Sequence, residues 1–134
     1  RVIREFRNWD VLESNGLTVV KTGDDWFRVK RNFSFIFEPK MSSHLVDRIV
    51  IKVYLYVKDD YKNRPEVTAM AQKLNEKLEI GQFYLDSDGD LVLLSHITFV
   101  DRIDSEEIQL FLEWIEFGMV GMVLAVPETL SYLK

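Results

Sequence analysis

The segment from Ile49 to Val57 is the part of the sequence that most constrains the fold. Its odd positions all carry branched aliphatic side chains, at Ile49, Ile51, Val53, Leu55 and Val57. Lys52, Tyr54 and Tyr56 stand at even positions. Because successive side chains of a strand point to opposite faces, this alternation predicts a strand with one buried and one exposed face. The chain must therefore build a sheet that is covered mainly on one side.

Two stretches before this strand also favour β structure. Residues 17–22 form a short β-branched run, and residues 27–37 place most of their apolar side chains at odd positions. A tight turn at Arg31-Asn32 would pair Lys30 with Phe33 and mix the two faces. We therefore predict that residues 27–37 form one long strand, bent near Asn32.

A hairpin is predicted after the midpoint of the chain. Residues 83–86 and 91–100 flank an Asp-Gly turn sequence at residues 87–90, which favours a tight connection. Both faces of the second arm are apolar near Leu91 and Val92, so we expect an interior strand there or, alternatively, a bulge in the turn.

Three stretches have helical periodicity: residues 2–14, 65–79 and 105 to about 125. Asp104 followed by Glu107 resembles a capping box at the start of the last helix, and Pro127 opens a short terminal helix. The expected order is α-βββ-α-ββ-α. This order predicts an α+β fold in a single domain, residues 1–134, in which about five antiparallel strands form a twisted sheet with helices mainly on one face.

Composition limits the classes of function. The 134 residues include no cysteine, which excludes thiolate chemistry and disulfides and favours a reducing, cytoplasmic location. A formal charge of -5 opposes binding to nucleic acid. The apolar run from Phe117 to Val126 is shorter than the roughly 20 residues that span a bilayer, so we expect no membrane contact.

Three sequence features resemble the YbjN-like family: the run Lys73–Leu78, the phrase Gly81–Leu93, and the acidic helix start after Asp104. The resemblance is best over residues 65–117. The fold of that family is that of the type III secretion chaperones. The resemblance implies a small, often dimeric α+β module without enzymatic activity, connected with regulation or with assisting other proteins. It implies no catalytic residues.

The motifs that suggest chemistry are better explained as structure. Asp86–Asp90 resembles the opening of a calcium loop, but its glycine is fourth instead of sixth and position twelve is Ile97. His44 and His96, the two histidines, have no spacing typical of a metal site or a catalytic base. We therefore expect no catalytic residue, metal or cofactor.

Two surfaces remain as candidates for binding. The outward face of the strand at 49–57 carries Lys52, Tyr54 and Tyr56, an aromatic and basic group suited to recognising a protein segment. The alternative is that these tyrosines only decorate a solvated sheet or lie beneath a helix.

The last long helix is apolar around most of its circumference. One domain can bury only a stripe of such a helix, so the helix is either buried on two sides or contacts another chain. We expect a homodimer contact at Trp114, Phe117, Met119 and Met122.

The leading hypothesis is a dimeric, non-enzymatic module that binds a protein partner in a chaperone-like or regulatory role. The alternative is a small-molecule sensor or small enzyme with a pocket between sheet and helices, using His96 and a carboxylate.

Overall fold

The computed structural model describes residues 18–22, 26–40, 47–79, 81–99 and 103–134. The helix expected at residues 2–14 and the side chain of His44 lie outside these ranges.

The described residues form one antiparallel sheet in the order β1-β2-β3-β4-β6-β5. Its strands are β1 (Thr18–Thr22), β2 (Phe27–Lys30), β3 (Ser34–Lys40), β4 (Asp47–Leu55), β5 (Gln82–Leu85) and β6 (Leu91–Phe99). The interior position expected for the second hairpin arm is confirmed, because β6 lies between β4 and β5.

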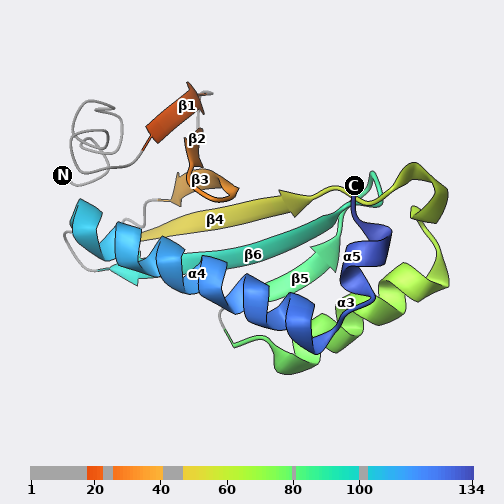
Figure 1. The fold of residues 1–134 in the computed structure, drawn as a ribbon. Coiled ribbons are helices and arrows are strands. Elements are labelled where there is room, and N and C mark those ends of the chain that lie inside the picture. The colour runs from red at the N-terminus through yellow and green to blue at the C-terminus, as the bar shows by residue number, and fades with distance from the viewer. Residues whose placement is uncertain (1–17, 23–25, 41–46, 80, 100–102) are drawn as a thin grey trace.

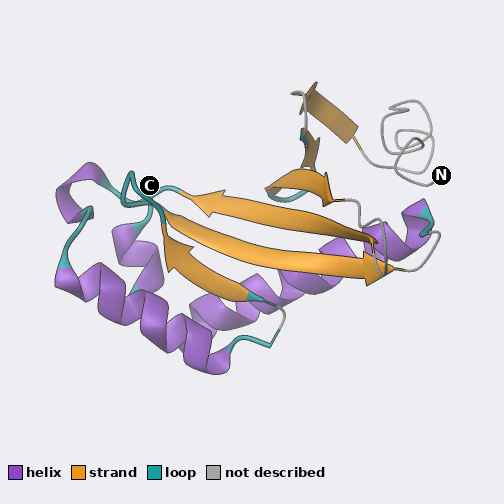
Figure 2. Ribbon diagram, turned by 180° about the vertical axis from the view of Figure 1, so that it is seen from behind, coloured by secondary structure: helices purple, strands orange, loops and turns teal. Residues whose placement is uncertain are grey.

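The helices cover one side of this sheet. They are α3 (Pro65–Lys77), α4 (Ser105–Ala125) and α5 (Thr129–Tyr132), with a 3-10 turn η1 at Asp59–Tyr61. In Figure 1, α4 crosses one face of β4 and β6, and α3 lies below β5. Seen from behind in Figure 2, the same strands stand in front of α4. The α+β class with helices mainly on one face is therefore confirmed.

The long strand predicted for residues 27–37 is wrong, because the chain turns back at residues 31–33 to form the β2–β3 hairpin. The turn has three residues, so Val29 pairs with Phe35 and Lys30 with Ser34. An odd number of turn residues keeps odd positions opposite odd positions. The apolar side chains of both strands therefore stay on one face of the hairpin. A two-residue turn would have mixed the two faces.

The core lies between the covered face of the sheet and the inner side of α4. Ile49, Ile51 and Val53 of β4 are at most 2% exposed, which confirms the face predicted from their alternation. Ile108 and Leu112 of α4 are fully buried against the same core.

The segment between α3 and β5 shows why the family-like motifs are structural. The side-chain amide of Asn75 donates to the carbonyl oxygen of Phe83 at 2.8 Å. In return, the Oδ1 of Asn75 accepts the backbone N–H of Phe83 at 2.6 Å. A Cβ at Gly81 would overlap the carbonyl oxygen of Leu94, so only glycine fits there. These residues fix β5 to α3 and to β6.

Candidate interaction surfaces

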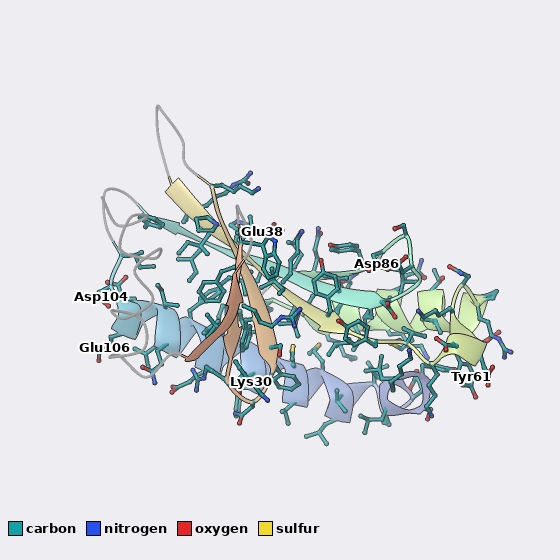
Figure 3. The ribbon with its side chains drawn as sticks, turned by 90° about the horizontal axis from the view of Figure 1, so that it is seen from above. Lys30, Glu38, Tyr61, Asp86, Asp104 and Glu106 are labelled. Carbon is teal, nitrogen blue, oxygen red and sulfur yellow. The ribbon has the colours of Figure 1, made fainter. Side chains whose placement is uncertain are left out.

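The uncovered face of the sheet holds Lys52 and Tyr54 as predicted, because they alternate with the buried residues of β4. The ammonium group of Lys52 lies 3.2 Å from a carboxylate oxygen of Glu38 on β3. Burial opposes the charge on Lys52, but Glu38 and the nearby Tyr54 and Tyr84 together hold its pKa above the ordinary value of 10.5. In Figure 3, Glu38 lies on the side of the sheet opposite α4.

Tyr54 also has a structural role. Tyr54 on β4 and Tyr84 on β5 both pair with Val92, which is fully buried although it points to the uncovered face. Burial raises the pKa of Tyr54. Tyr56 follows the end of β4 and is 53% exposed. The two predicted tyrosines therefore differ: Tyr54 is half-buried and Tyr56 is open to contact.

A hollow of about 350 Å³ lies on this face, at the end of the sheet near the β5–β6 turn. Its lining combines aromatic, basic and acidic side chains, including Trp26, Arg28, Tyr54, Tyr56, Glu38 and Asp88. Lys52 does not line the hollow but is tied to it through Glu38. The structure thus brings Tyr54 and Tyr56 together with Arg28 of β2 and with Trp26, which directly precedes β2.

The carboxylates of the β5–β6 turn maintain the fold. An oxygen of Asp86 accepts the backbone N–H groups of Asp88 and Asp90, each at 2.9 Å. An oxygen of the buried Asp90 accepts the N–H of Val57 at 2.9 Å. Gly89 has a φ of 82°, as a turn of this kind requires. Within the described residues, no group of three or more histidine, aspartate or glutamate side chains could hold a metal ion.

The side of α4 that faces away from the sheet is a stripe of exposed apolar residues. We call it the outer stripe, and it comprises Leu110, Trp114, Phe117, Val120 and Leu124. Phe117 is 80% exposed and Leu124 is 76% exposed, values unusual for side chains of this size. Gly121 lies in the same stripe, and a Cβ there would meet no atom of the described part of the chain within 4 Å.

The structure exposes two of the four residues predicted for the dimer contact, and the contact itself stays a prediction. Trp114 and Phe117 belong to the outer stripe. Met119 is 3% exposed and packs in the core, and Met122 is half-buried against it, so neither belongs to that surface. Leu110 and Leu124 were missed, although the spacing 110, 114, 117, 121, 124 contains the signal.

Sequence analysis also missed a polar brace on the flank of α4. Arg31, in the β2–β3 turn, donates to the carbonyl oxygen of Gln109 at 3.0 Å, and its Nε lies 3.1 Å from the buried Glu116. The third guanidinium nitrogen, Nη2, lies 3.5 Å from a carboxylate oxygen of Glu113. Figure 3 shows the end of β2, marked by Lys30, over the middle of α4. The brace holds the hairpin on the helix.

A cavity between sheet and helices corresponds to the pocket of our alternative hypothesis. It has a volume of about 290 Å³, lies beside the C-terminal half of α4, and is open to solvent at the exposed residues Val120, Leu124 and Leu130. His96, which we had assigned to such a pocket, is exposed and pairs with Val50 on the uncovered face of the sheet. The idea that His96 serves this cavity is therefore wrong.

Helix α4 is long and apolar enough, from Glu106 to Ala125, to cross a membrane by length and composition alone. Our sequence estimate considered only the shorter run after Phe117. Core helices of soluble proteins pass the same test, and α4 buries Ile108 and Leu112 in the core. The expected absence of membrane contact stays a prediction.

Comparison with known proteins identifies the family. A family model described as "YbjN: Putative bacterial sensory transduction regulator" matches residues 10–116. The chain belongs to the YbjN family. A search of the curated proteins found no match.

The crystal structure of YbjN from E. coli, described as "a putative transcription regulator", has a similar fold. The TM-score is 0.68 at 14% identity, and the similarity covers 100% of this chain and 96% of that one. The YbjN family match ends at residue 116, before the C-terminal half of α4. The outer stripe from Phe117 onward and much of the cavity wall lie beyond the matched residues.

Proposed function

We propose that this chain is a non-enzymatic regulatory protein that works by binding other proteins, and that its working form is a homodimer. The outer stripe of α4 is the observation that carries the proposal. Contiguous exposed apolar side chains of this size usually mark a protein contact. The descriptions of the family and of E. coli YbjN as regulators support the regulatory role.

A second copy of the same helix suits the outer stripe. Leu110, Trp114, Phe117, Gly121 and Leu124 follow each other at steps of four, three, four and three. This is the repeat by which two helices pack along a seam. The stripe extends for roughly 21 Å at 1.5 Å per residue, enough for about two repeats.

The charges of α4 favour antiparallel pairing. Its four glutamates, at residues 106, 107, 113 and 116, all precede Phe117, and residues 117–125 carry no charge. Parallel helices would bring the two acidic halves together, whereas antiparallel helices separate them and also align their dipoles favourably.

Antiparallel pairing also matches large side chains with small ones. If the two-fold axis lies between residues 117 and 121, Phe117 of one copy meets Gly121 of the other, and Trp114 meets Leu124. Since none of the described residues occupies the space beside Gly121, a phenyl ring of the second copy can approach the backbone there.

The hollow on the uncovered sheet face is the surface that we assign to the regulated partner. Tyr54, Tyr56 and Trp26 offer large contact areas, and the exposed Asp88 adds negative charge. A partner segment with aromatic or basic side chains suits this lining. A chaperone-like role and a cytoplasmic location form part of the proposal.

Multi-angle light scattering over a range of concentrations tests the dimer. The protein should approach twice its chain mass of 15.8 kDa, and Phe117→Glu should keep it monomeric. Gln72→Glu, which adds the same charge to an exposed position of α3, should leave the dimer intact. A wild-type protein that stays monomeric at every concentration would refute the homodimer.

Affinity capture from lysate of the source organism tests the sheet face. A partner retained by the wild type should be lost from the variant with Tyr56→Ala and Asp88→Asn. Thr98→Ala, an exposed change elsewhere on β6, serves as the control. Retention of every partner by the double variant would remove the sheet-face assignment.

A further inference from the structure

The hollow on the uncovered face of the sheet is lined by β2, β3 and β4 and by the β5–β6 turn. Arg28 comes from β2, Ile36 from β3 and Tyr54 from β4. Ile36 pairs with Arg28, is 8% exposed and forms the floor. Glu38 and Asp86 also line the hollow, and Figure 3 shows both on the side of the sheet away from α4. Because both polar and apolar atoms are accessible in its wall, the hollow can hold a ligand by charge as well as by contact area.

Three of the four carboxylates in this lining already have partners within the chain. Glu38 pairs with the ammonium group of Lys52 at 3.2 Å. Asp86 accepts two backbone N–H groups of the turn, each at 2.9 Å. The buried Asp90 accepts a backbone N–H at 2.9 Å and lies 3.6 Å from the ammonium group of Lys62. These three carboxylates are therefore explained by the fold.

Two charges of the lining are left over, one of each sign. They belong to Arg28 and to the exposed Asp88. Neither side chain forms an ion pair or a hydrogen bond with any residue that the structure describes. A guanidinium group suits a carboxylate, which it can bind through two parallel hydrogen bonds. The Asp88 carboxylate suits an ammonium or guanidinium group. The hollow thus complements a ligand that carries both charges.

The two unpaired charges stand on opposite sides of the hollow. Arg28 lies on β2, and Asp88 lies in the turn that leads into β6. The order β2-β3-β4-β6 puts three strand spacings between these strands, roughly 14 Å along the sheet. A free amino acid carries its two charges on a single carbon atom and is too short to meet both. An extended peptide rises about 3.3 Å per residue, so residues about four positions apart span this distance.

We infer that the hollow binds an extended segment of the partner protein that carries an acidic residue, a central apolar or aromatic residue and a basic residue. The acidic residue pairs with Arg28 and the basic residue, about four positions away, pairs with Asp88. The central side chain packs on Ile36 and on the rings of Tyr54 and Tyr56. This inference rests on the proposed assignment of the hollow to the regulated partner, and it specifies the chemistry of that partner.

Selection of random peptides displayed on phage tests the charge pattern. Wild-type protein should enrich peptides with an acidic and a basic residue on either side of an apolar one. Arg28→Glu should select a basic residue in place of the acidic one, and Asp88→Lys should select an acidic residue in place of the basic one. Arg48→Glu, an exposed change on β4 outside the hollow, should select the wild-type pattern.

Fluorescence anisotropy with the peptide that wild type selects most strongly measures each contact. Arg28→Gln and Asp88→Asn should each weaken binding about tenfold, the effect of one hydrogen bond to a charged group. Asp60→Asn, an exposed change outside the hollow, should leave the affinity unchanged. Because Asp88 is exposed in a turn, its variant reports on binding even if Arg28→Gln folds poorly.

Three results would overturn the inference: no enrichment on wild type, selected peptides that lack one of the two charges, or an affinity that Asp88→Asn leaves unchanged. The affinity capture described above uses natural partners and the loss of Tyr56 and Asp88 together. It can therefore uphold the sheet-face assignment even if this charge pattern is wrong.

Discussion

The two sides of α4 are both apolar, yet they have opposite surroundings. On the inner side, Ile108, Leu112 and Ile115 are fully buried against the sheet. On the outer side, Leu110 is 58% exposed and Phe117 is 80% exposed. Composition cannot distinguish these two sides, because leucine stands on both. The comparison shows that a helix can carry one stripe for its own core and a second stripe for another chain.

The largest expected effect compares the same substitution on the two sides. Leu112→Ala leaves a cavity in the core and should lower the free energy of unfolding by about 2–5 kcal/mol. Leu110→Ala should change it by no more than about 0.5 kcal/mol in the monomer, because that side chain is already exposed. Urea unfolding of both variants in a Phe117→Glu background measures the difference. Similar losses would mean that the outer side is also packed within one chain.

The next effect concerns the flank between the two sides. Arg31→Ala removes the brace and leaves the buried Glu116 without its cation, at a cost of about 2 kcal/mol. Arg48→Ala, at an exposed position on β4, is the matched control and should cost little. The same urea titration measures both variants. If Arg31→Ala and Arg48→Ala lower the free energy of unfolding equally, the contact between Arg31 and Glu116 contributes no net stability.

The smallest expected effect is at Gly121, where one substitution should change the stability of the monomer and the affinity of the dimer in opposite directions. Gly121→Ala should stabilise the monomer by about 0.5–1 kcal/mol, because alanine favours helix and the added methyl group meets none of the residues that the structure describes. The same methyl group should weaken the dimer, because Phe117 of the second copy needs that space. Sedimentation equilibrium and thermal unfolding measure the two quantities. A variant that is more stable and pairs equally well would place Gly121 outside the contact.

Much of the fold could be predicted because its signals are local. The alternation in residues 49–57 identified the buried face of β4. The cap of α4 is also as expected, since the carboxylate of Asp104 accepts the N–H of Glu107 at 2.8 Å. The β2–β3 turn was missed because the alternation of apolar and polar residues is the same in two arrangements. A continuous strand and a hairpin with a three-residue turn both keep the odd positions on one face.

The surfaces were harder to predict because they depend on orientation and on distant contacts. Met119 and Phe117 are both apolar and two residues apart, and only the docking of α4 on the sheet decides which one is buried. Arg31 is 85 residues from Glu116 in the sequence, and no local pattern links them.

The central claim is that two copies of the chain pair antiparallel through the outer stripe of α4. Because the sequence contains no native cysteine, single cysteines can be introduced to test this pairing directly. Trp114→Cys and Leu124→Cys are prepared as separate variants, mixed, oxidised gently and analysed by intact mass. If outer stripes pair antiparallel, the main product should be the mixed disulfide between the two variants. Disulfides mainly between identical chains would indicate parallel helices, and no disulfide at all would contradict pairing through α4.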